Sequence, residues 1–238
     1  MVYNTMGGGL MQLVAYGAQD IYLTGNPQIT FFKVVYRRHT NFSMEAIEQT
    51  WDGASTGTTP ARCVATISRN GDLVHRMYLE ILGVPKAGNT VTNYGAKVIT
   101  DVEVEIGGQK IDKHTGQWMN VWAHLTEPNP SGHIGSINNQ DQTGTLFQNM
   151  SAMGGAVGGA TTAVTIFVPL MFWFCRNPGL ALPLIALQYH EVKVILNHNF
   201  SGTYYNAEPT HNKLWADYIY LDTDERRRFA QVSHEYLI

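Results

Sequence analysis

The nine histidines are the residues of this chain that most directly suggest chemistry, because clustered imidazoles can bind a transition metal. A metal-binding β-barrel of the cupin type requires a His-x-His pair, and this sequence has none. The nearest approach is His190-Glu191 with His198. On one strand these two histidines would stand about 26 Å apart, at 3.3 Å per residue, too far to share an ion. The other candidates fall in predicted loops or a helix without ligand spacing: His114, His124, His133 and His211. We therefore predict no metal site.

Nucleophilic and acid/base motifs are also missing from the sequence. There is no Gly-x-Ser-x-Gly, and the glycine runs at 7–9 and 154–159 lack the lysine and the strand–loop–helix context of a phosphate loop. Asp101, Glu103 and Glu105 recur at every second position, which is typical of the solvated face of a strand. We predict no catalytic residue, no cofactor and no enzymatic activity.

Charge argues against specific binding of nucleic acid. The formal net charge is −3, so no bulk positive field would attract a phosphate backbone. Basic residues cluster only at Lys33, Arg37, Arg38 and His39 and at 226–228, and the second cluster has acidic neighbours. We interpret both clusters as interface or linker surface.

Two kinds of covalent modification need weighing. Asn-x-Ser acceptor patterns for N-glycosylation start at Asn41, Asn149 and Asn199, and Asn149 is the strongest candidate because it lies in a long predicted loop. No secretory signal is present to direct the chain to the usual glycosylation pathway. Cys63 and Cys175 are far apart in sequence, and we interpret them as two buried thiols rather than a disulfide.

The elements that would position these residues are mostly strands. Eight runs have strand composition or alternation: 43–50, 62–69, 72–82, 98–106, 109–113, 165–174, 187–197 and 214–221. Asn70-Gly71 predicts a tight hairpin between the second and third runs, and Gly107-Gly108 predicts one between the fourth and fifth. The longest apolar run, 163–175, is too short for a membrane-spanning helix.

Unequal connections between these strands favour one particular architecture. Eight strands joined by two tight turns and several long loops predict an all-β fold, a single antiparallel jelly roll of two packed four-stranded sheets. The long loop 114–164 begins with an amphipathic helix over 117–125, whose Trp118, Val121, Trp122 and Leu125 share one side. Residues 1–25 are predicted to form an N-terminal arm, residues 26–222 the jelly-roll domain, and a short capped helix is expected over 29–32.

Long stretches of the sequence also resemble a known family. The segment GGLMQLVAYGAQDIYLTGNPQITFFK at 8–33 and the segment NPGLALPLIALQYHEVK at 177–193 are similar, almost residue for residue, to the major capsid proteins of large nucleocytoplasmic DNA viruses of algae and amoebae. Further similar stretches are 35–38, 40–42, 67–73, 105–114, 168–170, 215–226, 228–231 and 234–238. No similarity is found over 128–163.

This resemblance implies a structural virion protein that forms an icosahedral capsid shell. It implies pseudo-hexameric capsomers of three chains, with other copies of the chain, minor capsid proteins and an internal membrane surface as partners, and assembly in the host cytoplasm. Family members carry two jelly rolls, so residues 223–238 are expected to be a linker and the start of a second, truncated barrel. That expectation leaves open a fragment, a split gene product or a single-barrel relative. The alternative from another class is a jelly-roll carbohydrate-binding module or cupin-like metal enzyme.

Overall fold

The fold is described from a computed structural model, which covers residues 17, 31–32, 39–57, 60–84, 94–127, 163–200 and 208–238. Residues Thr40–Ile238 form one compact unit, described here by itself. Most of the predicted arm and of the helix expected over 29–32 lie outside the described residues. Phe31 and Phe32, which are described, form a turn.

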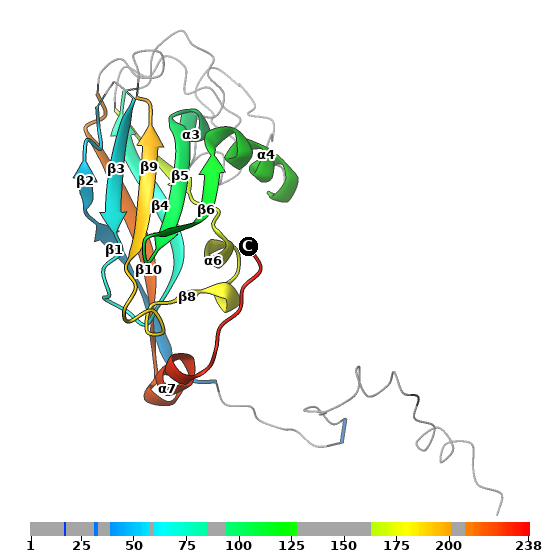
Figure 1. The fold of residues 1–238 in the computed structure, drawn as a ribbon. Coiled ribbons are helices and arrows are strands. Elements are labelled where there is room, and N and C mark those ends of the chain that lie inside the picture. Colours follow the sequence, from blue (N-terminus) through cyan, green and yellow to red (C-terminus); the bar gives the residue numbers. More distant parts are fainter. Residues whose placement is uncertain are drawn as a thin grey trace, which may run out of the picture. The chain divides into compact units, whose positions relative to one another are not determined.

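Two antiparallel sheets form the unit (Figure 1). Sheet I has the order β1 (Phe42–Gln49), β10 (His211–Leu221), β4 (Leu73–Gly83) and β7 (Val164–Pro169), and the two-residue β8 (Leu182–Pro183) also pairs with β4. Sheet II has the order β2 (Trp51–Gly53), β3 (Ala61–Thr66), β9 (Val192–His198), β5 (Ile99–Ile106) and β6 (Gln109–Thr115).

The strand pairing is that of a jelly roll. When the short strands β2 and β8 are set aside, the eight others pair first with last, second with seventh, third with sixth and fourth with fifth: β1 with β10, β3 with β9, β4 with β7 and β5 with β6. A long hairpin rolled into two sheets has this pattern. The predicted antiparallel jelly roll is confirmed. The described residues nevertheless form ten strands in two five-stranded sheets, not eight strands in two four-stranded sheets.

One predicted hairpin is confirmed and the other is wrong. Gly107 and Gly108 have φ of 59° and 83° and join β5 to β6 in a tight turn, as their freedom at positive φ allows. Asn70-Gly71 does not close a hairpin, because β3 lies in sheet II and β4 in sheet I. A Cβ on Gly71 would stand 2.9 Å from the Cβ of Tyr218, so this glycine permits a close approach between segments.

Two predicted strands were too long. The run 165–174 forms β7 only as far as Pro169, and Trp173–Arg176 then form the short helix α6. Proline has no N–H to donate to a neighbouring strand. The helical turn that follows buries Trp173 and Phe174 without extending the strand. The run 187–197 becomes β9 only from Val192, because residues 188–190 are in turns and the His190 N–H bonds the Leu187 carbonyl at 3.0 Å. A 3₁₀ turn, η1 (Pro178–Leu180), precedes β8.

Three further helices lie outside the sheets. The short α3 (Tyr94–Lys97) packs beside α4 (Gly116–Thr126) through Ala96 and Ala123. The predicted helix over 117–125 is confirmed as α4, and the Thr115 hydroxyl caps it by accepting from the Trp118 N–H at 3.2 Å. Residues Thr223–Gln231 form α7, capped by Asp222, and residues 232–238 contain no strand.

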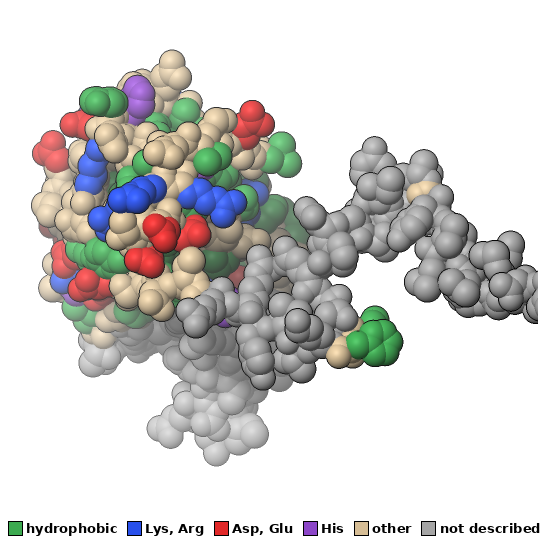
Figure 2. Space-filling model, turned by 90° about the horizontal axis from the view of Figure 1, so that it is seen from below, with side chains coloured by type: hydrophobic (Ala, Val, Ile, Leu, Met, Phe, Trp, Pro, Cys, Tyr) green, Lys and Arg blue, Asp and Glu red, His purple; other side chains and the backbone are tan. Residues whose placement is uncertain are grey.

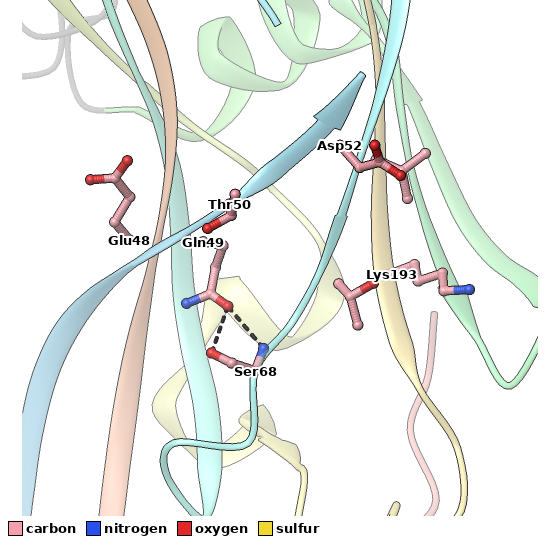
Figure 3. A pocket seen from close by; sticks show the side chains of 8 residues that line it. Glu48, Gln49, Thr50, Asp52, Ser68 and Lys193 are labelled. Atoms are coloured by element: carbon pink, nitrogen blue, oxygen red, sulfur yellow. Dashed lines mark hydrogen bonds between the residues drawn. The ribbon is translucent and has the colours of Figure 1, made fainter. Parts of the chain in front are cut away.

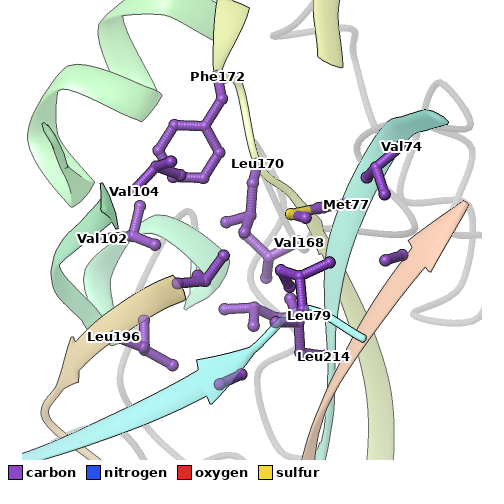
Figure 4. Close-up of a cluster of buried hydrophobic side chains, with 14 of the residues drawn as sticks. Val74, Met77, Leu79, Val102, Val104, Val168, Leu170, Phe172, Leu196 and Leu214 are labelled. Atoms are coloured by element: carbon purple, nitrogen blue, oxygen red, sulfur yellow. The ribbon is translucent and has the colours of Figure 1, made fainter. Parts of the chain in front are cut away.

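The core fills the space between the sheets. Inward side chains of sheet I, such as Met77, Leu79 and Leu214, meet Val102, Val104 and Leu196 of sheet II, while Phe172 closes one end of the cluster (Figure 4). These residues are at most 1% exposed. Alternating apolar residues on both sheets are what a sandwich core requires.

Candidate assembly surfaces

The histidines weighed as metal ligands are dispersed among the described residues. His114 and His211 lie in strands β6 and β10, not in the loops that the sequence predicted. His114 is buried and its Nε2 is 3.1 Å from Asp112, while His198 Nε2 is 2.8 Å from the Ala54 carbonyl. Burial lowers the pKa of both imidazoles. Within the described ranges, no group of three or more His, Cys, Asp or Glu could hold a metal ion.

The alternating carboxylates of β5 lie on the outer face of sheet II, and two of them, Asp101 and Glu103, are paired with lysines of β6. Lys113 Nζ is 3.1 Å from Asp101 and 2.9 Å from Glu103, and Lys110 Nζ is 2.8 Å from Glu103. Hydrogen bonds from Lys110 and Lys113 hold the pKa of Glu103 below its ordinary value. A low pKa and a lysine partner suit an ionic strand pair, and they do not suit a general acid.

The modification candidates differ in accessibility. Asn41 is exposed just before β1. Asn199 is half-buried, its N–H bonds the Val98 carbonyl at 2.8 Å, and the Phe200 that follows is buried. Asn149 lies outside the described residues. Cys63 and Cys175 are both free thiols, and burial raises the pKa of each to about 12.

The second basic cluster lies on α7 at one end of the barrel. Arg226 Nε is 3.0 Å from the Asp72 carboxylate, which also accepts from the Leu221 N–H at 2.8 Å. Phe229 packs against the buried cluster of Leu73, Ala181 and Ile219. Seen from this end, acidic and basic side chains lie next to one another (Figure 2). Of the first cluster, only His39 is among the described residues. Arg226 therefore holds α7 to the barrel, which fits the linker interpretation.

A polar pocket of about 440 Å³ lies where the chain crosses from sheet I to sheet II (Figure 3). Gln49 Oε1 accepts from both the N–H and the hydroxyl of Ser68, each at 2.9 Å. Two of the charged groups of the lining have partners in the same chain: Glu48 pairs with Lys213 at 3.1 Å and Lys193 with Glu191 at 3.4 Å. The third, Asp52, is exposed to solvent.

The outer face of sheet I is mixed: apolar side chains lie beside two charged contacts, Glu48 with Lys213 and Glu80 with His211, each at 3.1 Å. The register places Phe42 beside Leu221 and Met44 beside Ile219. Farther along the sheet, Tyr78 lies beside Trp215, and the indole N–H of Trp215 donates to Glu80 at 2.6 Å. β1 pairs only with β10, so its other edge carries no strand among the described residues. Exposed strand edges of this kind can pair with another chain.

Helix α4 has its larger apolar side turned outward. Its buried residues are Gly116, Met119 and Ala123, whereas Val121 and Leu125 are exposed. The stripe predicted from spacing is therefore real, but only Trp118 packs partly on the core. The ring of Trp118 stacks between His114, at 4.1 Å between centroids, and Trp122, at 5.3 Å.

Sequence reasoning missed the direction of this stripe and the apolar outer face of β1. Spacing alone gives the side of the helix on which residues gather, but not which side meets the barrel. The alternation of Phe42, Met44 and Ala46 was a usable signal for β1, because apolar residues at every second position of an edge strand share one face.

Comparisons of the sequence with known proteins agree on one family. The family described as major capsid protein N-terminus matches residues 30–222. The major capsid protein of Pyramimonas orientalis virus is 57% identical over 238 residues, covering 98% of this chain and 58% of that protein. That of Paramecium bursaria Chlorella virus 1 is 48% identical over 246 residues, covering 98% of this chain and 52% of that protein.

Solved structures agree with these relatives. A chain of the PBCV-1 virus capsid, known as a quasi-atomic model, superposes with a TM-score of 0.68 at 38% identity, over 87% of this chain and 49% of that one. The chain thus spans little more than half the length of the relatives that it matches. By the family match along the whole barrel and by the identity to these proteins, the chain belongs to the major capsid protein family.

Proposed function

We propose that this chain is a structural component of the capsid shell of a large DNA virus and has no enzymatic activity. The observation that carries the proposal is the family match along the whole jelly roll, residues 30–222, on a barrel whose exposed apolar side chains gather on β1 and α4. Contiguous exposed apolar surface is typical of sites of protein association. The mechanism is burial of this surface between barrels of neighbouring copies.

Higher assembly follows the family expectation. Three chains form a pseudo-hexameric capsomer, and capsomers form the icosahedral shell of the virion after assembly in the host cytoplasm. Residues 1–25 act as an arm that contacts a neighbouring subunit or an internal membrane, residues 26–222 form the barrel, and residues 223–238 link it to a second jelly roll. Minor capsid proteins are further partners.

The alternative, a carbohydrate-binding module or cupin-like enzyme, has less support. A sugar site of this kind needs open aromatic faces in a concave surface, but Trp118 is stacked between His114 and Trp122. The described polar pocket is lined mainly by polar and charged residues and by no aromatic residue. Sugar attachment at Asn149, Asn41 or Asn199 stays a prediction, which intact-mass measurement of protein from infected cells would test.

Light scattering of the purified chain after size exclusion tests the proposal. A capsid role predicts species larger than the 26.5 kDa monomer, growing with concentration and needing no ligand. Negative-stain microscopy should then show regular rings or sheets. A chain that stays monomeric at every concentration and binds a glycan array would favour the carbohydrate-binding alternative.

A further inference from the structure

A short strap, defined as residues 54–57, follows β2 and lies across the end of the barrel at which β9 ends. Two consecutive carbonyls of the strap are bound by buried side chains. The Ala54 carbonyl is 2.8 Å from His198 Nε2, and the Ser55 carbonyl accepts from Asn212 Nδ2 at 3.0 Å. His198 ends β9 of sheet II and is 1% exposed, whereas Asn212 lies in β10 of sheet I and is 4% exposed. The strap is therefore tied to both sheets.

The site under the strap suits the neutral form of His198. Because a carbonyl oxygen only accepts, the bond to Ala54 places a proton on Nε2 and leaves Nδ1 of the neutral ring unprotonated. Nδ1 is buried and has no hydrogen-bond partner among the described residues. A second proton, on Nδ1, would be a buried donor without an acceptor, on a ring that then carries a positive charge. The closed strap therefore disfavours protonation of His198.

Among the described residues, the groups packed around His198 offer it no negative charge. In register it lies between Ala61 of β3 and Ile99 of β5, and its ring centroid is 4.5 Å from that of Phe200. Cys63 is the titratable residue of β3 that is buried in the core, and burial raises the pKa of its thiol to about 12. Burial lowers the pKa of His198, although the hydrogen bond to the strap acts in the opposite direction.

The charged side chains near this end of the barrel lie on the outer faces of the sheets or are exposed. Arg62 and Asp101 pair in register with Asn197, which precedes His198 and so points to the opposite face of β9. The others are His211, which pairs with Glu80, Lys213, which pairs with Glu48, and the exposed Asp52, Lys97 and Glu208. These groups are therefore not placed to act as a buried counter-ion for His198.

A second buried histidine provides a contrast. His114 is 4% exposed, and its Nδ1 likewise has no hydrogen-bond partner in the described part of the chain. Its Nε2, however, lies 3.1 Å from the Asp112 carboxylate, which can balance the charge of an imidazolium. Burial lowers the pKa of His114, Asp112 counters this effect, and Arg176 adds to it. A protonated His114 thus has a counter-ion at hand, which makes this residue the matched control for His198.

We propose that the strap is a latch released by acid: protonation of His198 detaches residues 54–57 and opens this end of the barrel to solvent. The proton comes from solvent, and water reaches the charged ring once the strap has lifted. Below the ordinary histidine pKa the open form binds more protons than the closed form, so acid favours opening. The ratio of open to closed strap rises by up to about tenfold per pH unit below about pH 6.5, until His198 protonates in the closed form as well. The inference concerns a single copy and does not rest on the proposed capsid function.

A nitroxide spin label on the strap of the full chain measures this release. Ala54→Cys places the label on an exposed side chain and keeps the carbonyl that His198 binds. Burial raises the pKa of the Cys63 and Cys175 thiols to about 12, which slows their labelling. Spectra are recorded from about pH 8 to about pH 5, at a concentration where light scattering shows a monomer. We expect a mobile spectral component that grows as the pH falls below about 6.5.

Substitutions in the labelled chain identify the group that titrates. His198→Gln can still donate to the Ala54 carbonyl but takes up no proton, so its mobile component should stay constant across the pH range. His114→Gln should leave the acid response of the label unchanged. Asn212→Ala removes the second tie and should enlarge the mobile component several-fold at pH 8, with the rise in acid retained. Thermal melting at pH 8 checks that the variants fold.

Several results would overturn the latch. They are a label whose mobility does not change with pH, an acid response that persists in His198→Gln, and a response that is lost in His114→Gln. A loss of far-UV circular dichroism over the same pH range would also overturn it, because the whole barrel would then be unfolding. If His198→Gln does not fold, the ring ¹⁵N resonances of His198 decide, since their titration must coincide with release of the label. These results leave the capsid role standing, which light scattering tests separately.

Discussion

The two sheets of this barrel are alike inside and differ outside. Inward, both present alternating apolar side chains to one core. Outward, sheet II carries Asp101 and Glu103, ion-paired with Lys110 and Lys113. The outer face of sheet I carries aromatic and aliphatic side chains, Phe42 and Trp215 among them, beside the charged contacts of Glu48 with Lys213 and of Glu80 with His211.

This difference indicates which surface is suited to meet another chain. Charges that are already paired within one chain would lose solvation on burial, and a new contact would repay little of that cost. Apolar side chains in water gain free energy when covered, about 25 cal/mol per Å². The exposed apolar side chains of β1, Phe42 and Met44, and of α4, Val121 and Leu125, therefore favour association, and the ion-paired strands β5 and β6 favour solvent.

The largest effects on stability are expected from substitutions in the shared core, to which both sheets should be equally sensitive. Leu79→Ala in sheet I and Leu196→Ala in sheet II each empty a site that is at most 1% exposed. Each should lower the free energy of unfolding by about 2–5 kcal/mol. Urea denaturation of the two variants measures this. A loss confined to one sheet would show that the barrel does not have a single shared core.

The next effect separates the outer faces. Trp215→Ala removes a half-buried indole and its hydrogen bond to Glu80, and should cost about 2 kcal/mol of unfolding free energy. Lys113→Ala breaks two exposed ion pairs on sheet II and should cost much less. Denaturation in the same buffer compares them directly. Equal losses would contradict the view that the packed indole contributes more stability than the ion pairs of Lys113.

The smallest expected effect concerns pH: Glu103 on sheet II and Asp217 on sheet I should change the stability of the fold with pH in opposite directions. Hydrogen bonds from the lysines lower the pKa of Glu103, so its stabilising contribution is present above the ordinary glutamate pKa and is lost as pH falls through the lowered value. Burial raises the pKa of Asp217 on sheet I, although Arg76 and His75 act in the opposite direction. Its contribution to stability is therefore present below the ordinary aspartate pKa and is lost as pH rises through the raised value.

Melting temperatures of two isosteric variants test these signs. At neutral pH, Glu103→Gln should melt below the parent chain and Asp217→Asn above it. Both differences should close as the buffer is acidified toward pH 3. The same sign for both variants at neutral pH would mean that the two faces do not differ electrostatically in the way described.

Much of the fold could be predicted because local signals and tertiary pairing agree. Alternation predicted β3, β4 and β5, and two adjacent glycines predicted the β5–β6 turn. Asn70-Gly71 failed because a hairpin signal describes only local geometry, while the reason for Gly71 is the distant Tyr218. Pro169 marked the end of β7, but the apolar residues after it hid the change to a helix.

The candidate site was less predictable than the fold. The α4 stripe could be identified from spacing, yet its exposure depends on the barrel meeting the smaller side chains Gly116 and Ala123 instead. The exposed apolar residues of β1 and α4 lie far apart in sequence, and their positions on the barrel follow from sheet order, which no local pattern encodes.

Hydrogen exchange at low and high concentration of the purified chain tests the central claim most directly. Burial of the exposed apolar side chains of β1 and α4 between copies predicts slower exchange at high concentration in peptides from Phe42–Gln49 and Gly116–Thr126. Peptides from Ile99–Ile106 and Gln109–Thr115, on the ionic face, should exchange at the same rate at both concentrations. Protection of the ionic face alone, or no change with concentration anywhere, would contradict the account.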